Sequence, residues 1–310
     1  MRRRKYPCSP VFGNRKIRRV NTRFLATLCA IAEAGSLAGA ARALGLASAT
    51  VAEQVQALER ELGVRLVGRQ GRAVTLTDEG RAVVAAGRDI LARVADLAQV
   101  AQLGRLRGGL RVGAVSTALI SILPPALKLM AERSPEIALH IAPGTSSQLA
   151  RMLEAGEIDC ALTVQPRFAL AKGWGWLPVR REPLTLVSPV GLRRDTTDAY
   201  LSAAPLIRMD RRSPTGAIVT DYLNSRRIVP NELFELDAPD TITILVSLGL
   251  GIALLPDYGF RSSDDRPIRK IPIADRAFVR SIGILHRRGA RIALIDALHA
   301  ALCDSCARPG

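Results

Sequence analysis

The sequence is poor in cysteine, and the few cysteines it has do not form a recognisable framework. There are five of them, an odd and scattered set: Cys8, Cys29, Cys160, Cys303 and Cys306. Such a set is typical of reduced thiols in a cytosolic protein rather than of disulfides. Cys303 and Cys306 form one CxxC pair, but thioredoxin-like chemistry needs that pair at the start of a helix that follows a strand. This pair lies at the extreme C-terminus, so neither redox nor metal function is predicted.

Long apolar runs are also missing. The longest, Ile242 to Pro256, contains two glycines and is too short to span a bilayer. The basic N-terminal segment is not followed by the apolar stretch of an export signal. We therefore expect a cytoplasmic protein that makes no membrane contact.

The motifs that mark common enzyme classes are absent as well. The sequence has no GxSxG, HExxH, P-loop or GxGxxG pattern, and its three histidines, His140, His286 and His299, do not show metal-ligand spacing. We therefore predict no catalytic residue, no metal site and no cofactor. An enzyme remains the first alternative function, and a solute-binding protein the second.

Acidic residues are scarce in the N-terminal part of the chain. The net charge is +16, and the first 80 residues carry 14 Lys/Arg against 6 Asp/Glu. Residues 1–19 hold eight basic groups and no acidic one, which predicts a basic disordered arm. This imbalance suits binding to a polyanion, although a solvated basic face is the alternative. The arm itself either follows DNA phosphates or has no specific role.

Apolar residues at helical spacing predict three short helices after this arm. The first runs from Asn21 to Gly35. The second has Ser36 as its N-cap and ends at Gly45, and the third begins near Ala47 or Ser48 and ends at Gly63. Their buried faces are marked by the following apolar residues: Phe24, Leu25, Leu28 and Ile31; Leu37, Ala40, Ala41 and Leu44; Val51, Val55, Leu58 and Leu62.

A basic hairpin is predicted after the third helix. Val64–Val67 and Ala73–Leu76 have strand-like composition, and Gly68 to Arg72 form a flexible tip between them. This tip is a candidate wing, and we expect Arg69 and Arg72 to contact phosphate or the minor groove of DNA.

The outward side of the third helix is small and polar, which would let it approach a DNA groove closely. Side chains at the start of a recognition helix meet base edges in the major groove. Gln54 could bond adenine through both amide atoms, and Glu53 could accept from cytosine N4 while repelling phosphate. The complete predicted DNA-contacting set is Ser36, Ala47, Ser48, Ala49, Ala52, Glu53, Gln54, Gln56, Arg69 and Arg72.

These features together resemble one known family. From Ala40 to Gly80 the order AAxxLGLAxATVxxQVxALExELGVxLVxRxGRxVxLTxEG is similar to the N-terminal domain of LysR-type transcriptional regulators. The family usually has Ser then Arg where this chain has Ala52 and Glu53, a difference that bears on DNA sequence preference and not on the fold. The resemblance implies a winged helix-turn-helix over residues 20–77, a linker helix over 78–104 and an effector-binding domain over 105–310.

A long helix is predicted to follow the hairpin, with Thr77 as its cap. Ile90, Val94, Leu97 and Ala101 recur at spacings of four, three and four, which gives an apolar seam suited to a partner helix. We predict a homodimer through this helix, and the alternative is that the seam packs on its own domain. The resemblance further implies a homotetramer built from two dimers, and RNA polymerase is a further candidate partner.

The remainder of the chain alternates strands and helices, which predicts a parallel sheet in an α/β fold. One helix is expected over Ile120–Arg133. The resemblance supplies the arrangement: two subdomains like those of periplasmic binding proteins. Subdomain I would comprise residues 105–181 and 275–310, and subdomain II residues 182–274.

Polar residues follow the ends of several predicted strands, where α/β proteins bind ligands. Hydroxyls and helix N-termini at such ends suit a small organic anion, although any one of these residues could be an ordinary helix cap. The predicted effector-binding set is Ser116, Thr117, Thr145, Ser146, Gln165, Thr215 and Thr241. The sequence therefore predicts a regulator that binds double-stranded DNA and a small-molecule effector. A pure solute-binding protein would require export and would not require residues 20–76.

Overall fold

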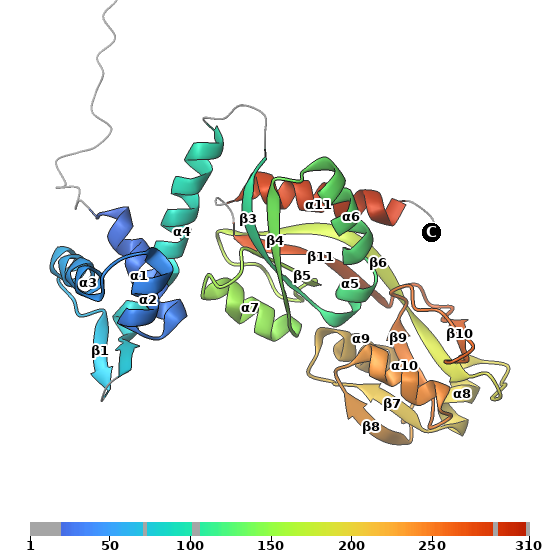
Figure 1. Cartoon of the computed structure of the whole chain (residues 1–310). Coiled ribbons are helices and arrows are strands. Elements are labelled where there is room, and N and C mark those ends of the chain that lie inside the picture. Colours follow the sequence, from blue (N-terminus) through green and yellow to red (C-terminus); the bar gives the residue numbers. More distant parts are fainter. Residues whose placement is uncertain (1–19, 71–72, 101–105, 288–290, 308–310) are drawn as a thin grey trace, which may run out of the picture. The chain divides into compact units, whose positions relative to one another are not determined.

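The computed structural model describes residues 20–70, 73–100, 106–287 and 291–307. They form two compact units that divide after Leu91, and each is described separately (Figure 1). The predicted arm at residues 1–19 and the wing residue Arg72 lie outside the described residues.

The first unit contains the three predicted helices: α1 (Thr22–Ala34), α2 (Leu37–Leu44) and α3 (Ser48–Leu62). Their ends follow from local chemistry. The side chains of Asn21 and Ser36 accept hydrogen bonds from backbone N–H groups in the first turns of α1 and α2. The three helices end at the glycines that the sequence indicates, each at positive φ: Gly35, Gly45 and Gly63.

The hairpin that follows differs from the predicted one. It consists of β1 (Val67–Gln70) and β2 (Ala73–Leu76), which pair antiparallel, so the predicted strand Val64–Val67 is wrong. The backbone N–H groups of Leu66 and Val67 both donate to Glu59 Oε1 on α3, at 2.7 and 3.2 Å. Because Leu66 is also completely buried, this segment is bound to the helices and the strand begins only at Val67.

A long helix, α4 (Asp78–Val100), follows the hairpin. Thr77 caps it as predicted, with its Oγ1 accepting from Gly80 N at 2.9 Å. Two residues of the predicted seam, Ile90 and Val94, are each 44% exposed. Ala101 and the side chain of Leu97 lie outside the described part of the chain. None of the helices in the described ranges is long and apolar enough to cross a membrane.

The main sheet of the second unit has seven strands, five of which build the first half of the unit. These five are β3 (Gly108–Ala114), β4 (Ile137–Pro143), β5 (Cys160–Val164), β11 (Val279–Arg287) and the first part of β6 (Trp174–Pro189). The predicted parallel order is correct for β3, β4 and β5. The parallel order does not extend to β11, which pairs antiparallel with both of its neighbours, β5 and β6. The reason is that β6 leads into the second half of the unit and β11 returns from it.

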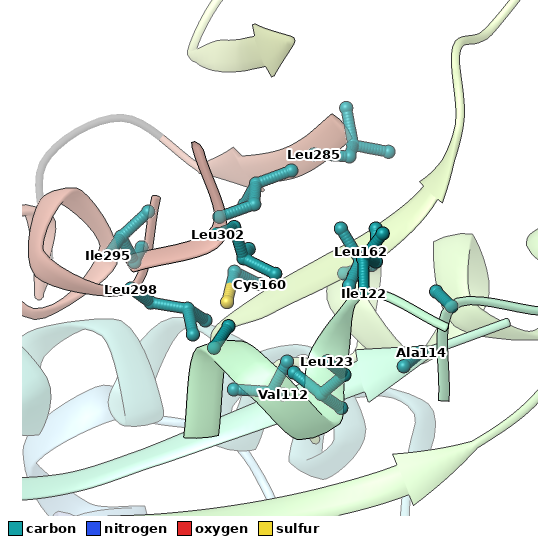
Figure 2. Close-up of a cluster of buried hydrophobic side chains, with 14 of the residues drawn as sticks. Val112, Ala114, Ile122, Leu123, Cys160, Leu162, Leu285, Ile295, Leu298 and Leu302 are labelled. Atoms are coloured by element: carbon teal, nitrogen blue, oxygen red, sulfur yellow. The ribbon is translucent and has the colours of Figure 1, made fainter. Parts of the chain in front are cut away.

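Four helices accompany this sheet: α5 (Ser116–Ile120), α6 (Leu123–Arg133), α7 (Ser146–Glu154) and α11 (Ile292–Ala307). The single helix predicted over Ile120–Arg133 is wrong, because Pro124 and Pro125 start a new helix after a break at Ser121. Figure 2 shows how α11 and α6 close the core, with α11 placing Leu298 and Leu302 near the β5 residues.

The second half of the unit is smaller and has its own buried core. Its elements are α8 (Thr197–Ala203), β7 (Leu206–Met209), α9 (Pro214–Ser225), β8 (Glu232–Leu236), α10 (Pro239–Ser247), β9 (Ala253–Pro256) and β10 (Ile268–Pro272). Strands β7 and β8 are parallel, whereas β9 and β10 pair antiparallel with the end of β6. The sequence did not predict α8, β10 or the first part of β6.

A buried ion cluster lies where β6 passes from one half to the other. Glu182 is 1% exposed, and its two carboxylate oxygens pair separately with Arg180 and with Arg280 of the neighbouring strand β11. Arg180 also donates to Ser121 Oγ and to the carbonyl of Tyr258, both at 3.1 Å. One carboxylate therefore bridges two guanidinium groups at the crossing, and the cluster keeps a net positive charge.

Replacing Glu182 with glutamine should reduce the free energy of unfolding by about 3–5 kcal/mol, because the buried Arg280 would lose its counter-charge. Urea unfolding followed by the fluorescence of Trp174 and Trp176, both packed on the first core, measures this. The control is Glu235→Gln, which removes an exposed partner of Arg211 and should leave the midpoint unchanged. Equal stability of the two variants would contradict the role given to Glu182.

Candidate functional site

Helix α3 presents an exposed polar side and a buried aliphatic side. Val51, Val55 and Leu58 are at most 2% exposed and fix the helix on its neighbours. The exposed or half-exposed side carries the following predicted residues: Ala47, Ser48, Ala49, Ala52, Glu53 and Gln56. Ala47 is the N-cap residue, so this small-residue surface starts at the helix N-terminus, whose backbone dipole favours an anion.

Other members of the predicted DNA-contacting set are held differently. Ser36 caps α2, with Oγ accepting from Gly39 N at 3.0 Å. The carbonyl oxygen of Gln54 accepts a hydrogen bond from the buried Thr27 of α1. This bond anchors α3 on α1 and directs the amide oxygen inward, whereas a bidentate contact with adenine needs it outward. The backbone of Arg69 lies in β1, and Arg72 lies outside the described residues.

A polar cavity of about 270 Å³ lies between the two halves of the second unit. Helices α5 and α7 reach it from the first half and α9 from the second, each starting just after a strand. Five predicted effector-binding residues line it: Ser116, Thr117, Thr145, Ser146 and Thr215. Gln165 lines an adjacent cavity of about 450 Å³ instead. Thr241 is exposed on α10 and is not part of either lining.

Arg280 connects the two sides of this cavity. It is 4% exposed, and its guanidinium donates to Thr117 Oγ1 at 3.0 Å and to Thr215 Oγ1 at 3.3 Å. Burial lowers the pKa of Arg280, and the charge of Glu182 opposes that effect. The group stays charged because the pKa of a free guanidinium lies far above neutrality.

The hydroxyls around Arg280 are oriented as donors. Thr117 and Thr215 already accept from Arg280, and Ser146 Oγ accepts from Thr163 Oγ1 at 2.9 Å. A hydroxyl that accepts one bond keeps its own proton for another acceptor. Three O–H groups and the first turns of α7 and α9 can thus bind an anionic group.

Thr145 is a helix cap, which was the alternative to ligand binding that the sequence left open. It is the N-cap of α7 in a complete capping box with Gln148, with Thr145 Oγ1 accepting from Gln148 N at 3.3 Å and Gln148 Oε1 accepting from Thr145 N at 2.8 Å. Its hydroxyl also lies 3.2 Å from Ser147 Oγ. Thr145 therefore lines the cavity and stabilises the helix at the same time.

Three charged residues of this site were missed from the sequence: Arg280, Glu182 and Asp237. Arg280 shares the buried face of β11 with Ile282 and Ile284 in a period of two. A charged residue on a buried strand face needs a partner, so its place in this alternating pattern could have indicated a buried ion pair. Asp237 follows β8 directly, and its position at a strand end was the signal that could have indicated it.

Known proteins share this architecture. The structure of a full-length OxyR variant from Pseudomonas aeruginosa matches with a TM-score of 0.73 and 21% identity, covering 92% of this chain and 95% of that one. The uncharacterized HTH-type transcriptional regulator YnfL of Escherichia coli K12 is 30% identical over 90% of this chain and 99% of its own length. A probable hydrogen peroxide-inducible genes activator of Mycobacterium avium is 30% identical over 75% of this chain and 76% of its own.

Two family models match consecutive parts of the chain. Residues 22–81 match the bacterial regulatory helix-turn-helix protein of the lysR family, and residues 103–307 match the LysR substrate binding domain. The first range contains the exposed side of α3, and the second contains the cavity around Arg280. The chain belongs to the LysR family of DNA-binding transcriptional regulators, which join a helix-turn-helix domain to an effector-binding domain.

Proposed function

We propose that this regulator reads its operator with the outer side of α3 and responds to a small anion bound around Arg280. The observation that carries the DNA part is the exposure of Ser48, Ala49 and Glu53 on a helix whose opposite side is fully packed. Small side chains allow close approach to the major groove, and Glu53 favours cytosine through its N4 group. Arg69 and Arg72 of the wing supply phosphate or minor-groove contacts, which position the protein without specifying sequence.

The assembly follows from α4. Ile90 and Val94 expose apolar surface on a helix that spans roughly 35 Å at 1.5 Å per residue, which suits a partner helix. We infer a homodimer through α4, a homotetramer of two such dimers and RNA polymerase as a further partner. We retain the domain boundaries that were inferred from the sequence, with domains at residues 20–77, 78–104 and 105–310. Because its target is chromosomal DNA, we place the protein in the cytoplasm.

The effector is bound without being transformed. Arg280 and the O–H groups of Thr117, Ser146 and Thr215 form a donor set for a small anion. This donor set supports the binding of an anion. Residues of both halves meet the ligand, and only a difference in affinity between two arrangements of the protein can turn that binding into a signal.

Thiol chemistry is not needed for this response. The M. avium relative carries hydrogen peroxide in its name, and peroxide sensing by cysteine requires an accessible thiolate. Among the described cysteines, Cys29 and Cys160 are buried and Cys303 and Cys306 are partly exposed, and desolvation raises the pKa of the Cys160, Cys303 and Cys306 thiols. The cavity lining contains no cysteine.

Gel-shift titration tests the DNA part. Ala49→Glu should abolish retention of the regulator's own upstream DNA, because it places a large carboxylate against the groove. The wild-type protein should bind, with an affinity that falls steeply as salt rises. The matched control is Ala86→Glu, an exposed position on α4, which should bind like the wild type. Retention of DNA by Ala49→Glu at wild-type affinity would remove α3 as the recognition helix.

Sedimentation equilibrium tests the assembly. Val94→Asp should convert the dimer to a monomer, because it buries a charge in the apolar seam. Arg93→Asp changes the neighbouring exposed residue on another side of α4 and should leave the mass unchanged. An unchanged mass for Val94→Asp would assign dimerisation to a different surface.

A thermal-shift assay tests the effector part with sulfate and a panel of small carboxylates. A binding anion at a hundred times its Kd should raise the Tm by about 5–10 °C. Replacing Thr117 and Thr145 together by Val should remove that shift. Thr241→Val, outside the lining, is the control and should keep it. If the double variant kept the full shift, the effector site would lie elsewhere.

A further inference from the structure

The lining of the cavity around Arg280 contains a negatively charged carboxylate as well as hydrogen-bond donors. Strands β7 and β8 are parallel, with Met209 opposite Leu236, so the residues that follow them meet at one edge. Asp210 follows β7 and Asp237 follows β8, and Asp237 lines the cavity that contains Arg280. The second half of the unit thus presents a carboxylate toward the donors of the first half.

This carboxylate differs from its acidic neighbours because none of the residues that the structure describes is paired with it. Asp210 is bound by the backbone and side chain of Arg212, and Glu235 is bound in the same way by Arg211. In the described part of the chain, Asp237 neither accepts a hydrogen bond nor forms an ion pair. Asp237 is exposed at the cavity lining, and partial desolvation of its carboxylate and the charge of Asp210 still raise its pKa, an effect that Arg280 only partly offsets. A positive group placed beside Asp237 would stabilise the ionised form of its carboxyl group.

We propose that the effector is a zwitterion, an α-amino acid with an apolar side chain. This inference rests on the anion site proposed above and specifies its ligand. The carboxylate binds the hydroxyls of Thr117, Ser146 and Thr215 over Arg280, and the ammonium group pairs with Asp237. A simple anion in the same place would face Asp237 across the cavity and be repelled by it.

The apolar part of the ligand has a place next to this polar site. Another cavity, of about 540 Å³, shares Asp237, Thr145 and Ser146 with the cavity around Arg280. Apolar atoms of the following residues contribute to its lining: Ala150, Val164, Pro166, Phe168 and Leu285. Phe168 is 74% exposed, although a large aromatic side chain gains by being covered. Arg151, Asp210 and Arg212 also line this cavity, at its polar part. The two adjoining cavities thus offer a polar site for a charged head and a largely apolar surface for a side chain.

Isothermal titration of the full-length protein tests this with matched triplets of probes. One triplet is L-leucine, 4-methylpentanoate and 3-methylbutylamine, and the other is L-phenylalanine, 3-phenylpropanoate and 2-phenylethylamine. The amino acid of at least one triplet should bind at least tenfold more tightly than its deamino acid and than its amine. Asp237→Asn should weaken the amino acid at least tenfold and leave the deamino acid unchanged or tighter. Asp264→Asn, an exposed acid remote from the cavity lining, is the control and should change neither.

The outcomes separate this inference from the proposal on which it rests. If the deamino acids, sulfate or other carboxylates bind as tightly as the amino acids and Asp237→Asn has no effect, the anion site stands and the zwitterion is wrong. If none of the twenty common amino acids binds, the zwitterion is wrong as well. If an amino acid binds but Thr117→Val with Thr145→Val leaves its affinity unchanged, the site itself is wrong.

Discussion

The cross-strand pair of Glu182 and Arg280 is the interaction on which the ligand-binding unit depends. The two residues stand directly opposite each other in the β6–β11 ladder, at the point where the chain passes between the halves. A buried guanidinium requires a counter-charge, so this pair favours one register over its neighbours. A slip by one residue would turn Arg280 away from the cavity. The position of the cavity's positive charge is thus set by a strand ladder rather than by a loop.

The same guanidinium connects the two halves chemically. Through its two terminal nitrogens, Arg280 contacts Thr117 on α5 and Thr215 on α9. The affinity of a ligand that accepts hydrogen bonds from both hydroxyls therefore depends on the separation of these helices. This dependence is the differential binding energy that any ligand-driven rearrangement requires. The strand pair β6 and β11 connects the halves, and Glu182 and Arg280 stabilise it at the crossing.

Local signals in the sequence predicted local structure well. Ser36, Gly45 and Gly63 set helix ends through capping and positive φ, which depend only on adjacent residues. Long-range contacts caused the errors: the strand starts at Val67 because Glu59, on α3, binds the preceding amides. The hydroxyls at the strand ends were predicted by a general rule for α/β proteins. Asp237 and the contacts of Arg280 were not, because they depend on which strands become neighbours.

The proposed contacts of α3 would give affinity and specificity for DNA to different residues. The exposed side of α3 carries no basic residue near its start, and Glu53 there repels phosphate, so affinity must come from the basic groups elsewhere in a chain of net charge +16. The helix itself is fixed by Val51, Val55 and Leu58, which are almost completely buried. A ligand bound in the second unit cannot easily change the chemistry of so rigid a surface. It can act on the spacing between two such helices in an assembly, because operator half-sites have a fixed separation and a mismatch weakens both contacts.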